Sequence, residues 1–454
     1  MSLPKSVSLV GLYLVILAFW AITAPKFAAA EDYQAIDQYA LNAPKEVEES
    51  IEILVDYLIK PASNDRERLR AIFRWITANI VYDTEGFFAS LTATEEVPDT
   101  VTVEIPEMEI VLTPEMVLEK RVADCDGYSM LMEAMTETIV KRVRQYTDLA
   151  RRATELEIHQ IKGFAKGYGY MVGSDFSGSN HAWNAVNLDG RWHVIDCTWG
   201  AGRPNEKGEF VPEFEDYYFL TPLDELIYTH FPDDVAWQQI EEPVSKEEFI
   251  GLAFLWPSFF KYGMKVGSHP NSTIKVDSSV EISLYAPDSV LFEADLIESS
   301  GLLEAHHTFV QQDGEQCQIK AVFPSTGEYV LRLFSKLKGE EGTFKETLNY
   351  KIIAGSGAEQ QAGFPLTYES FQQNKAYLYL PLTRFLKAGK IHTFKLKVPE
   401  AKSVAVVTGG EWHKLVLRDG LFEGEVETEA GPVEVYALFP GSLSHDCLLE
   451  YSSR

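Results

Sequence analysis

A histidine and an aspartate stand on the two arms of one predicted β-hairpin, at His181 and Asp196. The arms are rich in aromatic and β-branched residues, and Asp189-Gly190 between them is the dipeptide that a two-residue type I′ turn prefers. Such a turn pairs Leu188 with Arg191. In that register the histidine and the aspartate share one face of the sheet, on a diagonal that their two side chains together can span.

The same register separates this pair from its neighbours. Side chains alternate along a strand, so His193, Cys197 and Asn184 are predicted to lie on the opposite face. His193 is therefore not the histidine that Asp196 could orient. The prediction depends on the turn, because a change of one residue in the loop would turn one arm over.

A cysteine that could use such a histidine lies upstream in RVADCDGYSMLMEAM, where Cys125 stands just before a helical pattern. A helix start favours the thiolate through the macrodipole and through free backbone N–H groups, which can also receive an oxyanion. Asp124 and Asp126 oppose this effect, because adjacent negative charge raises the pKa of a thiol. We therefore expect His181 to carry much of the activation.

These blocks resemble the transglutaminase-like superfamily. Cys125 in DCDGYS, His181 in HAWNAV and Asp196 in IDCTWGAG match its Cys-His-Asp triad in order and setting. The segment from Tyr217 to Phe249 is similar to the kyphoscoliosis peptidase family, whose members continue into β-rich modules. The resemblance implies a papain-like α+β domain in which the cysteine attacks, the histidine acts as general base and then acid, and the aspartate orients the imidazole.

The implied reaction is acyl transfer from a protein or peptide amide. Hydrolysis results if water takes the acyl group, and crosslinking results if a lysine amine does; the resemblance favours hydrolysis. Two hypotheses that assign other classes of function stay open. A catalytically silent binding protein could keep the triad as a relic, and an envelope scaffold or adhesin could use only the C-terminal modules to bind partner proteins.

Length and charge limit the alternatives. A chain of 454 residues exceeds the size at which single cores stop growing, so two or three domains are expected. The net charge of -28 argues against nucleic acid or an anionic membrane surface as partner. No EF-hand calcium loop and no cysteine or histidine spacing typical of zinc is found in the sequence, so neither a metal nor a cofactor is expected.

The N-terminus has the layout of a secretory signal peptide. Lys5 precedes an apolar run from Val7 to Ala24, and AAA at 28–30 comes before the acidic Glu31. We expect cleavage after Ala30 and an exported protein. The apolar run is marginally long enough to span a bilayer, so an uncleaved membrane anchor is the alternative.

Export would permit disulfides among the four cysteines, Cys125, Cys197, Cys317 and Cys447. The hairpin register points Cys197 away from the face of the aspartate, which disfavours a bridge to the nucleophile. The other two cysteines fall in different modules and are expected to be free, although sequence alone leaves the connectivity open.

Two core helices are predicted after the signal segment. One apolar stripe runs from Val47 to Leu58, and a second helix opens at Asn64 with a capping-box-like Glu67. Trp75 lies beside the apolar face of the second helix. A tryptophan upstream of the cysteine stabilises the oxyanion in some relatives of the superfamily, but packing is the expected role here.

Residues 95–112 are predicted to be an insertion with an edge strand or flap near the site. Thr113-Pro114 starts a short helix that leads to the nucleophile. Helical pattern then continues to about Leu156, and residues 158–172 are predicted as a strand interrupted by glycines. The loop at 173–180 is predicted to be flexible, either as a substrate-contacting rim or as a solvated linker.

From residue 265 onward the hydrophobic period changes to two. Short strands set between Gly, Pro and Asp turns predict an antiparallel β-sandwich, and a second set follows the linker at 355–363. The predicted domains are a signal peptide at 1–30, a transglutaminase-like domain at 31–262, and immunoglobulin-like β-sandwich modules at 263–355 and 364–454. No acidic residue stands at a spacing from His306-His307 that would indicate a catalytic pair, so these two histidines are expected on an exposed strand or loop.

Overall fold

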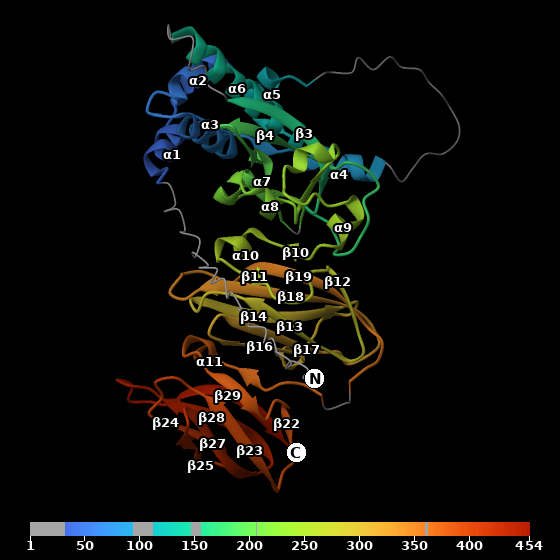
Figure 1. The fold of residues 1–454 in the computed structure, drawn as a ribbon, viewed down its shortest axis with the longest axis vertical. Coiled ribbons are helices and arrows are strands. Elements are labelled where there is room, and N and C mark those ends of the chain that lie inside the picture. Colours follow the sequence, from blue (N-terminus) through green and yellow to red (C-terminus); the bar gives the residue numbers. More distant parts are fainter. Residues whose placement is uncertain (1–31, 94–111, 147–155, 206, 359–361) are drawn as a thin grey trace, which may run out of the picture.

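The structure, a computed structural model, describes residues 32–93, 112–146, 156–205, 207–358 and 362–454. An α+β domain and two β-sandwiches follow one another along the long axis of the molecule (Figure 1). The predicted signal segment and the predicted insertion up to residue 111 lie outside the described residues. Within the described part of the chain, no helix combines the length and the apolar character needed to cross a bilayer.

Helices of the α+β domain begin where capping side chains predict. Asn64 accepts a hydrogen bond from the N–H of Glu67 at 2.8 Å, and Thr113 accepts one from the N–H of Met116 at 3.3 Å. The helices and 3-10 turns are α1 Gln34–Leu41, η1 Lys45–Glu49, α2 Ile51–Leu58, α3 Asp65–Asn79, α4 Thr84–Ala93, α5 Pro114–Lys120, α6 Cys125–Tyr146, α7 Cys197–Ala201, η2 Asp216–Tyr218, α8 Leu223–Leu226, η3 Val235–Gln238, α9 Lys246–Gly251 and α10 Pro257–Lys261.

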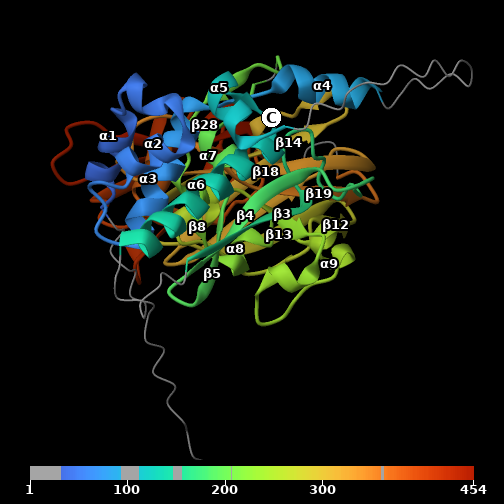
Figure 2. The same cartoon turned by 90° about the horizontal axis from the view of Figure 1, so that it is seen from above.

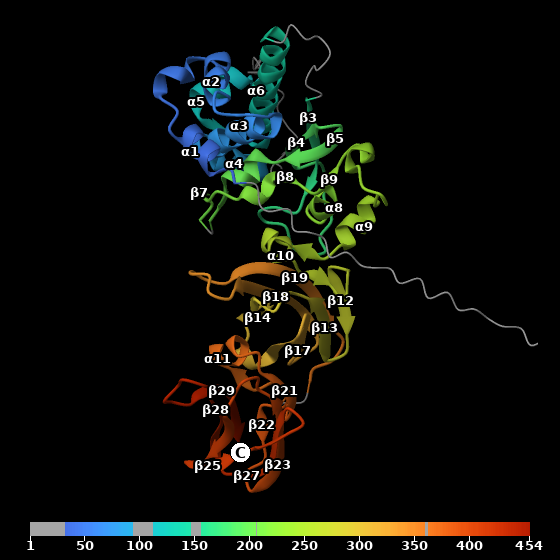
Figure 3. The ribbon, with the colours of Figure 1, turned by 60° about the vertical axis from the view of Figure 1, so that its left-hand side comes forward.

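A five-stranded antiparallel sheet forms the other layer, in the order β8-β5-β4-β3-β9. Helices α1, α2, α3 and α6 lie on one side of it and α8 and α9 on the other (Figures 2 and 3). Two short ribbons stand outside this sheet, β1 on β2 and β6 on β7. The strands are β1 Val81–Tyr82, β2 Val122–Ala123, β3 Glu157–Ala165, β4 His181–Leu188, β5 Arg191–Ile195, β6 Gly202–Pro204, β7 Phe210–Pro212, β8 Phe219–Thr221 and β9 His230–Pro232.

The predicted hairpin register is confirmed. Leu188 pairs with Arg191 and Asn184 with Ile195. Asp189 and Gly190 both have positive φ, 55° and 75°, as a type I′ turn requires.

The strand predicted over residues 158–172 is shorter than expected. β3 ends at Ala165, and the chain then turns, with Gly169 at a φ of 78°. Gly163 does not interrupt the strand. It lets β9 approach, because a Cβ at Gly163 would lie 2.2 Å from the carbonyl oxygen of Phe231.

The loop at 173–180 is held at its end rather than solvated throughout. The Asn180 side chain bonds to both the N–H and the C=O of Ala165, at 2.7 and 3.0 Å. The Ser179 hydroxyl donates to the carbonyl of Gly163 at 2.9 Å. Phe176 stacks on Tyr170. The loop therefore delivers the chain to the start of β4 at a fixed position.

The first sandwich packs a six-stranded sheet, β10-β19-β18-β14-β15 with β12 on β19, against the four-stranded sheet β11-β13-β17-β16. Its first strand precedes residue 263, and η4 Ala305–His307 holds the histidine pair. The strands are β10 Phe254–Leu255, β11 Lys265–Val266, β12 Thr273–Val276, β13 Ser279–Tyr285, β14 Val290–Glu298, β15 Gly301–Leu302, β16 Thr308–Asp313, β17 Gln316–Val322, β18 Gly327–Leu337 and β19 Lys345–Ala354.

The second sandwich repeats this arrangement, with β20-β29-β28-β24-β25 and β22 on β29 in one sheet and β21-β23-β27-β26 in the other. Each sandwich has its own apolar core, as does the α+β domain. The elements are β20 Leu366–Thr367, α11 Glu369–Gln373, β21 Tyr377–Leu380, β22 Phe385–Leu386, β23 Lys390–Lys397, β24 Ser403–Thr408, β25 Glu411–Lys414, β26 Val416–Arg418, β27 Leu421–Thr428, β28 Gly431–Leu438 and β29 Asp446–Ser453.

Candidate active site

Cys125 is the first residue of α6 and is half-buried. Asp124 caps the helix, because its carboxylate accepts from the N–H of Gly127 at 3.0 Å and its carbonyl accepts from the N–H of Tyr128 at 3.0 Å. Within the described residues, the backbone N–H groups of Cys125 and Asp126 make no such bond. Free N–H donors at a helix start can bind the oxygen of a carbonyl group that a neighbouring thiol attacks.

The two acidic neighbours of the thiol are both engaged. Besides the capping role of Asp124, the carboxylate of Asp126 pairs with Lys162 at 2.8 Å and accepts from the amide of Gln160 at 3.2 Å. The sequence predicted that these charges oppose the thiolate. In the structure a cation and hydrogen-bond donors offset part of that opposition.

Polar contacts fix the start of α6 against the sheet. The side-chain amide of Asn184 in β4 donates to the carbonyl of Ser129 at 3.0 Å, and Gln160 in β3 donates to the Ser129 hydroxyl at 2.6 Å. The Tyr128 hydroxyl donates to the carbonyl of Ile80 at 2.5 Å, which ties α6 to the end of α3. Helix α6, which begins at Cys125, and the strand that begins at His181 are thus held together.

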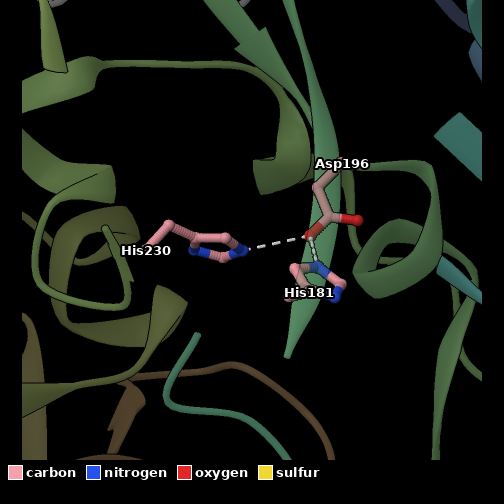
Figure 4. A group of neighbouring side chains, drawn as sticks. All are labelled: His181, Asp196 and His230. Atoms are coloured by element: carbon pink, nitrogen blue, oxygen red, sulfur yellow. Dashed lines mark hydrogen bonds and ion pairs between the residues drawn. The ribbon is translucent and has the colours of Figure 1, made fainter. Parts of the chain in front are cut away.

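His181 and Asp196 meet directly. Nε2 of His181 lies 2.8 Å from Oδ2 of Asp196, and both residues are buried (Figure 4). Nδ1 is therefore the ring nitrogen left for Cys125. Burial disfavours charge on the imidazole, but the Asp196 carboxylate and the Cys125 side chain raise the pKa of His181 to about 10. This environment favours the imidazolium form of His181.

The Asp196 carboxylate is held at both oxygens. Oδ1 caps α7 by accepting from the N–H of Trp199 at 3.0 Å, and the backbone N–H of Asp196 donates to the carbonyl of Tyr218 at 3.0 Å. Burial works to raise the pKa of this carboxyl, but the imidazoles of His181 and His230 hold it well below its usual range. The aspartate is ionised at neutral pH.

His230 is a member of the cluster that sequence reasoning missed. Its Nε2 lies 3.1 Å from the same Oδ2 of Asp196, and its Nδ1 lies 2.9 Å from the Thr229 hydroxyl (Figure 4). Burial lowers the pKa of His230 despite the nearby carboxylate, so this imidazole is neutral. The one signal available was its place inside the Tyr217 to Phe249 segment.

Aromatic rings enclose the two imidazoles. The Trp199 ring lies 5.4 Å from the His181 ring and 4.4 Å from the His230 ring, between centroids. Trp183 stands edge-on to His230 at 5.1 Å. This apolar surrounding strengthens the hydrogen bonds to the aspartate, because the local dielectric is low.

Tyr82 is a second residue that the sequence did not single out. It stands in β1, where it pairs with Ala123 of β2, two positions before Cys125. Burial, and then the negative charges at Cys125 and Asp124, raise the pKa of the Tyr82 phenol. The phenol therefore keeps its proton at neutral pH.

Other candidate residues lie apart from this cluster. Trp75 is fully buried beneath the guanidinium of Arg121, 4.6 Å from the ring centroid, so it packs in the helical core. Cys197 belongs to the same core, and burial raises its pKa well above the usual value. His193 lies on the helical side of the sheet, where burial and then the charge of Arg66 in α3 lower its pKa. All four cysteines are free thiols.

The cluster also brings together side-chain atoms of the kinds that bind metal ions. In the described part of the chain, one such atom from each of His181, Asp196 and His230 lies within 4.8 Å of the other two. Both imidazole nitrogens are at hydrogen-bond distance from one carboxylate oxygen, 2.8 and 3.1 Å. Protons between these atoms account for the geometry.

Two family models match the chain. Residues 53–197 match the transglutaminase-like superfamily, a span that includes all three predicted triad residues. Residues 246–365 match the KY-like, immunoglobulin-like domain, which corresponds to the first sandwich and the helix before it.

Several curated proteins are similar in sequence to this chain. Kyphoscoliosis peptidase of Homo sapiens is 28% identical over 328 residues, 71% of this chain and 43% of that protein. Lim and transglutaminase domain protein ltd-1 of Caenorhabditis elegans is 28% identical over 364 residues, 73% of this chain and 45% of that protein. Hillarin of Drosophila melanogaster is 28% identical over 51% of this chain and 26% of that protein. The chain spans less than half the length of each.

Among solved structures, a titin immunoglobulin tandem covers 40% of this chain and 91% of its own, with 11% identity and a TM-score of 0.14, which is too low to add to these matches. The family matches and the geometry of the site agree. The chain carries a transglutaminase-like core followed by a KY-like immunoglobulin-like domain, and it is a distant relative of the kyphoscoliosis peptidases.

Proposed function

We propose that this chain is a cysteine enzyme that acts on protein or peptide amides, with hydrolysis favoured over crosslinking. The observation that carries the proposal is the 2.8 Å contact between Nε2 of His181 and Oδ2 of Asp196, which leaves Nδ1 for Cys125 at the head of α6. These are the three roles of a nucleophile, a base and an orienting group.

In the proposed reaction the Cys125 thiolate attacks the amide carbonyl carbon. The carbonyl oxygen becomes an oxyanion, which the N–H groups of Cys125 and Asp126 stabilise. The His181 imidazolium gives its proton to the leaving nitrogen, the C–N bond breaks, and a thioester remains. The now neutral His181 then takes a proton from water, hydroxide adds to the thioester, and the acid product leaves as the thiolate and imidazolium are restored.

Crosslinking would follow the same path, with a lysine amine in place of water. Similarity to the kyphoscoliosis peptidases, which are named as peptidases, favours hydrolysis as the outcome. The experiment is to incubate the chain and a Cys125→Ala variant with a mixture of peptides and follow both by mass spectrometry. A thioester adduct on Cys125 with new peptide carboxyl ends supports the proposal; joined glutamine and lysine side chains would support crosslinking instead.

The competing hypothesis, a binding protein with a relic triad, makes the opposite prediction for the adduct on Cys125. In that case Cys125 forms no adduct, and the alanine variant behaves like the original chain in every assay. Under the enzyme proposal, substrates are proteins or peptides, and the two β-sandwiches are the parts available to bind further protein partners.

We also propose that the protein is exported. The support is the N-terminal sequence: one basic residue, an apolar run and AAA before Glu31. N-terminal sequencing of protein recovered outside the cytoplasm should find Glu31 first. Recovery of the full chain in the membrane fraction would support an uncleaved anchor instead.

A further inference from the structure

We infer that His230 is a positioning residue of the triad, a neutral imidazole that fixes the Asp196 carboxylate and shares its charge with His181. This inference rests on the proposed function of the triad. The contacts that carry it are the two imidazole nitrogens at 2.8 and 3.1 Å from the single oxygen Oδ2.

The proton on the neutral His230 ring is placed by Asp196, because an ionised carboxylate can only accept, so Nε2 must donate to Oδ2. Nδ1 is then an acceptor, and the Thr229 hydroxyl lies 2.9 Å from it, closer than the 3.2 Å to the carbonyl of Leu226, its other acceptor. The backbone around this pair is fixed as well, because the carbonyl of Thr229 accepts from the N–H of Lys166 at 2.9 Å. His230 itself pairs with Ala165 across the sheet.

One group beside His230 in the fold titrates near neutral pH. Burial lowers the pKa of Lys166, which follows β3 and bonds to the carbonyl of Thr229, to about 7, and its Nζ donates to the carbonyl of Leu252 at 3.0 Å. Asp196, just before α7, and His181 of β4 face it directly, and Cys125 of α6 lies beyond His181. From η2, Tyr218 faces it at 6.4 Å between ring centroids, and burial raises the pKa of this phenol well above its usual value. The remaining neighbours, Trp183 and Trp199, carry no charge.

The sharing of Oδ2 between two N–H donors affects the pKa of His181. Each N–H that bonds to Oδ2 takes part of the carboxylate charge, so His230 weakens the attraction of Asp196 for the His181 imidazolium while it holds the carboxylate still. Without this donor, Asp196 would bind the imidazolium more strongly. The pKa of His181 would then rise, and the pH at which the ion pair with Cys125 is lost would rise with it.

The test measures the rate of Cys125 alkylation by iodoacetamide against pH in the full chain, with site assignment by mass spectrometry. In a plot of alkylation rate against pH, one limb of the curve reports the deprotonation of His181. For His230→Phe we expect this limb to move to higher pH by about one unit, a shift of the size that loss of one charge-assisted hydrogen bond produces. For His230→Gln, whose amide N–H can reach the same oxygen, we expect the original limb. A residue with only a packing role would change stability and leave the limb where it was.

Thr229→Val provides a second route that leaves the imidazole in place. Without the hydroxyl, Nδ1 loses its donor and Nε2–H becomes a weaker donor to Asp196, so we expect a smaller shift in the same direction. If His230→Phe does not fold, as judged by near-UV circular dichroism, the Thr229→Val profile decides. An unchanged limb in every folded variant overturns the inference. An ordinary thiol profile for Cys125 in the original chain would instead overturn the proposed function.

Discussion

Nε2 of His181 and Oδ2 of Asp196 lie 2.8 Å apart although the two residues belong to different arms of a hairpin and are fifteen positions apart in the chain. The contact follows from the register of the Asp189-Gly190 turn, which places both side chains on the same face of the sheet. It also assigns the ring nitrogens, because Nε2 serves the aspartate and Nδ1 is left for Cys125.

Cys125 should be the most reactive thiol of the chain. Burial raises the pKa of Cys197 and Cys317, and burial with the charge of Glu434 raises that of Cys447 to about 11, whereas Cys125 stands at a helix start beside an imidazolium. At pH 7.5, limited iodoacetamide should label Cys125 at least about ten-fold faster than the others, by peptide mapping. His181→Ala should slow the labelling of Cys125 and leave the other three thiols unchanged, and equal labelling of all four thiols in the original chain would contradict the prediction.

Asp196→Asn should lower turnover of a peptide substrate by about a thousand- to ten-thousand-fold, because the imidazole loses the acceptor that holds its productive tautomer. The amide oxygen of asparagine can still cap α7, so the far-UV circular dichroism should be unchanged. His193→Ala is the matched control, because His193 lies on the helical side of the sheet and should retain close to full activity. Loss of activity in the control equal to that of the aspartate variant would refute the assignment.

The contribution of His181 to stability should fall as pH rises from 6.5 toward 10. Lys166, whose folded pKa burial lowers from 10.5 to about 7, contributes with the opposite sign over much of this range, so the His181 contribution is measured as a difference between two proteins. The folded pKa of His181 is raised from 6.5 to about 10, so its contribution to stability is complete below 6.5 and is lost as pH rises through the folded value. Asp196 acts at the other end: its pKa is lowered in the fold, so its contribution is present at neutral pH and is lost in acid.

The measurement is urea unfolding from pH 5.5 to 9.5, followed by tryptophan fluorescence, since Trp75, Trp183 and Trp199 all report on the α+β domain. Relative to Asp196→Asn, in which the raised pKa of His181 has lost its main cause, the original chain should lose stability as pH rises across this range. Equal slopes for the two proteins would show that His181 is not coupled to Asp196 in solution.

Gly163→Ala should disturb the site from a distance. The new Cβ would lie 2.2 Å from a backbone oxygen of β9, the strand that carries His230, and a backbone atom cannot rotate away. We expect about 1–3 kcal/mol of lost stability, as for an overpacked core, together with altered alkylation of Cys125. Gly251→Ala is the control, because a Cβ there would meet nothing within 4 Å. A neutral Gly163→Ala would mean that β9 can move away at little cost.

The features that sequence alone determined are local ones. The turn dipeptide set the hairpin register, the alternation of a strand put His181 and Asp196 on one face, and the caps at Asn64 and Thr113 set helix starts. In each case the atoms that decide the structure lie within a few residues of one another, so backbone geometry leaves few alternatives.

The features that needed tertiary structure depend on contacts between distant segments. His230 reaches Asp196 from 34 positions away because β9 pairs with β3, and Tyr82 stands opposite Ala123, two positions before Cys125, because β1 pairs with β2. A short strand such as β9 carries no periodic signal, and its neighbour in the sheet is chosen by the packing of the whole domain. The sequence therefore determined the two residues of the hairpin pair, and only the packed sheet decided that a second imidazole shares their carboxylate.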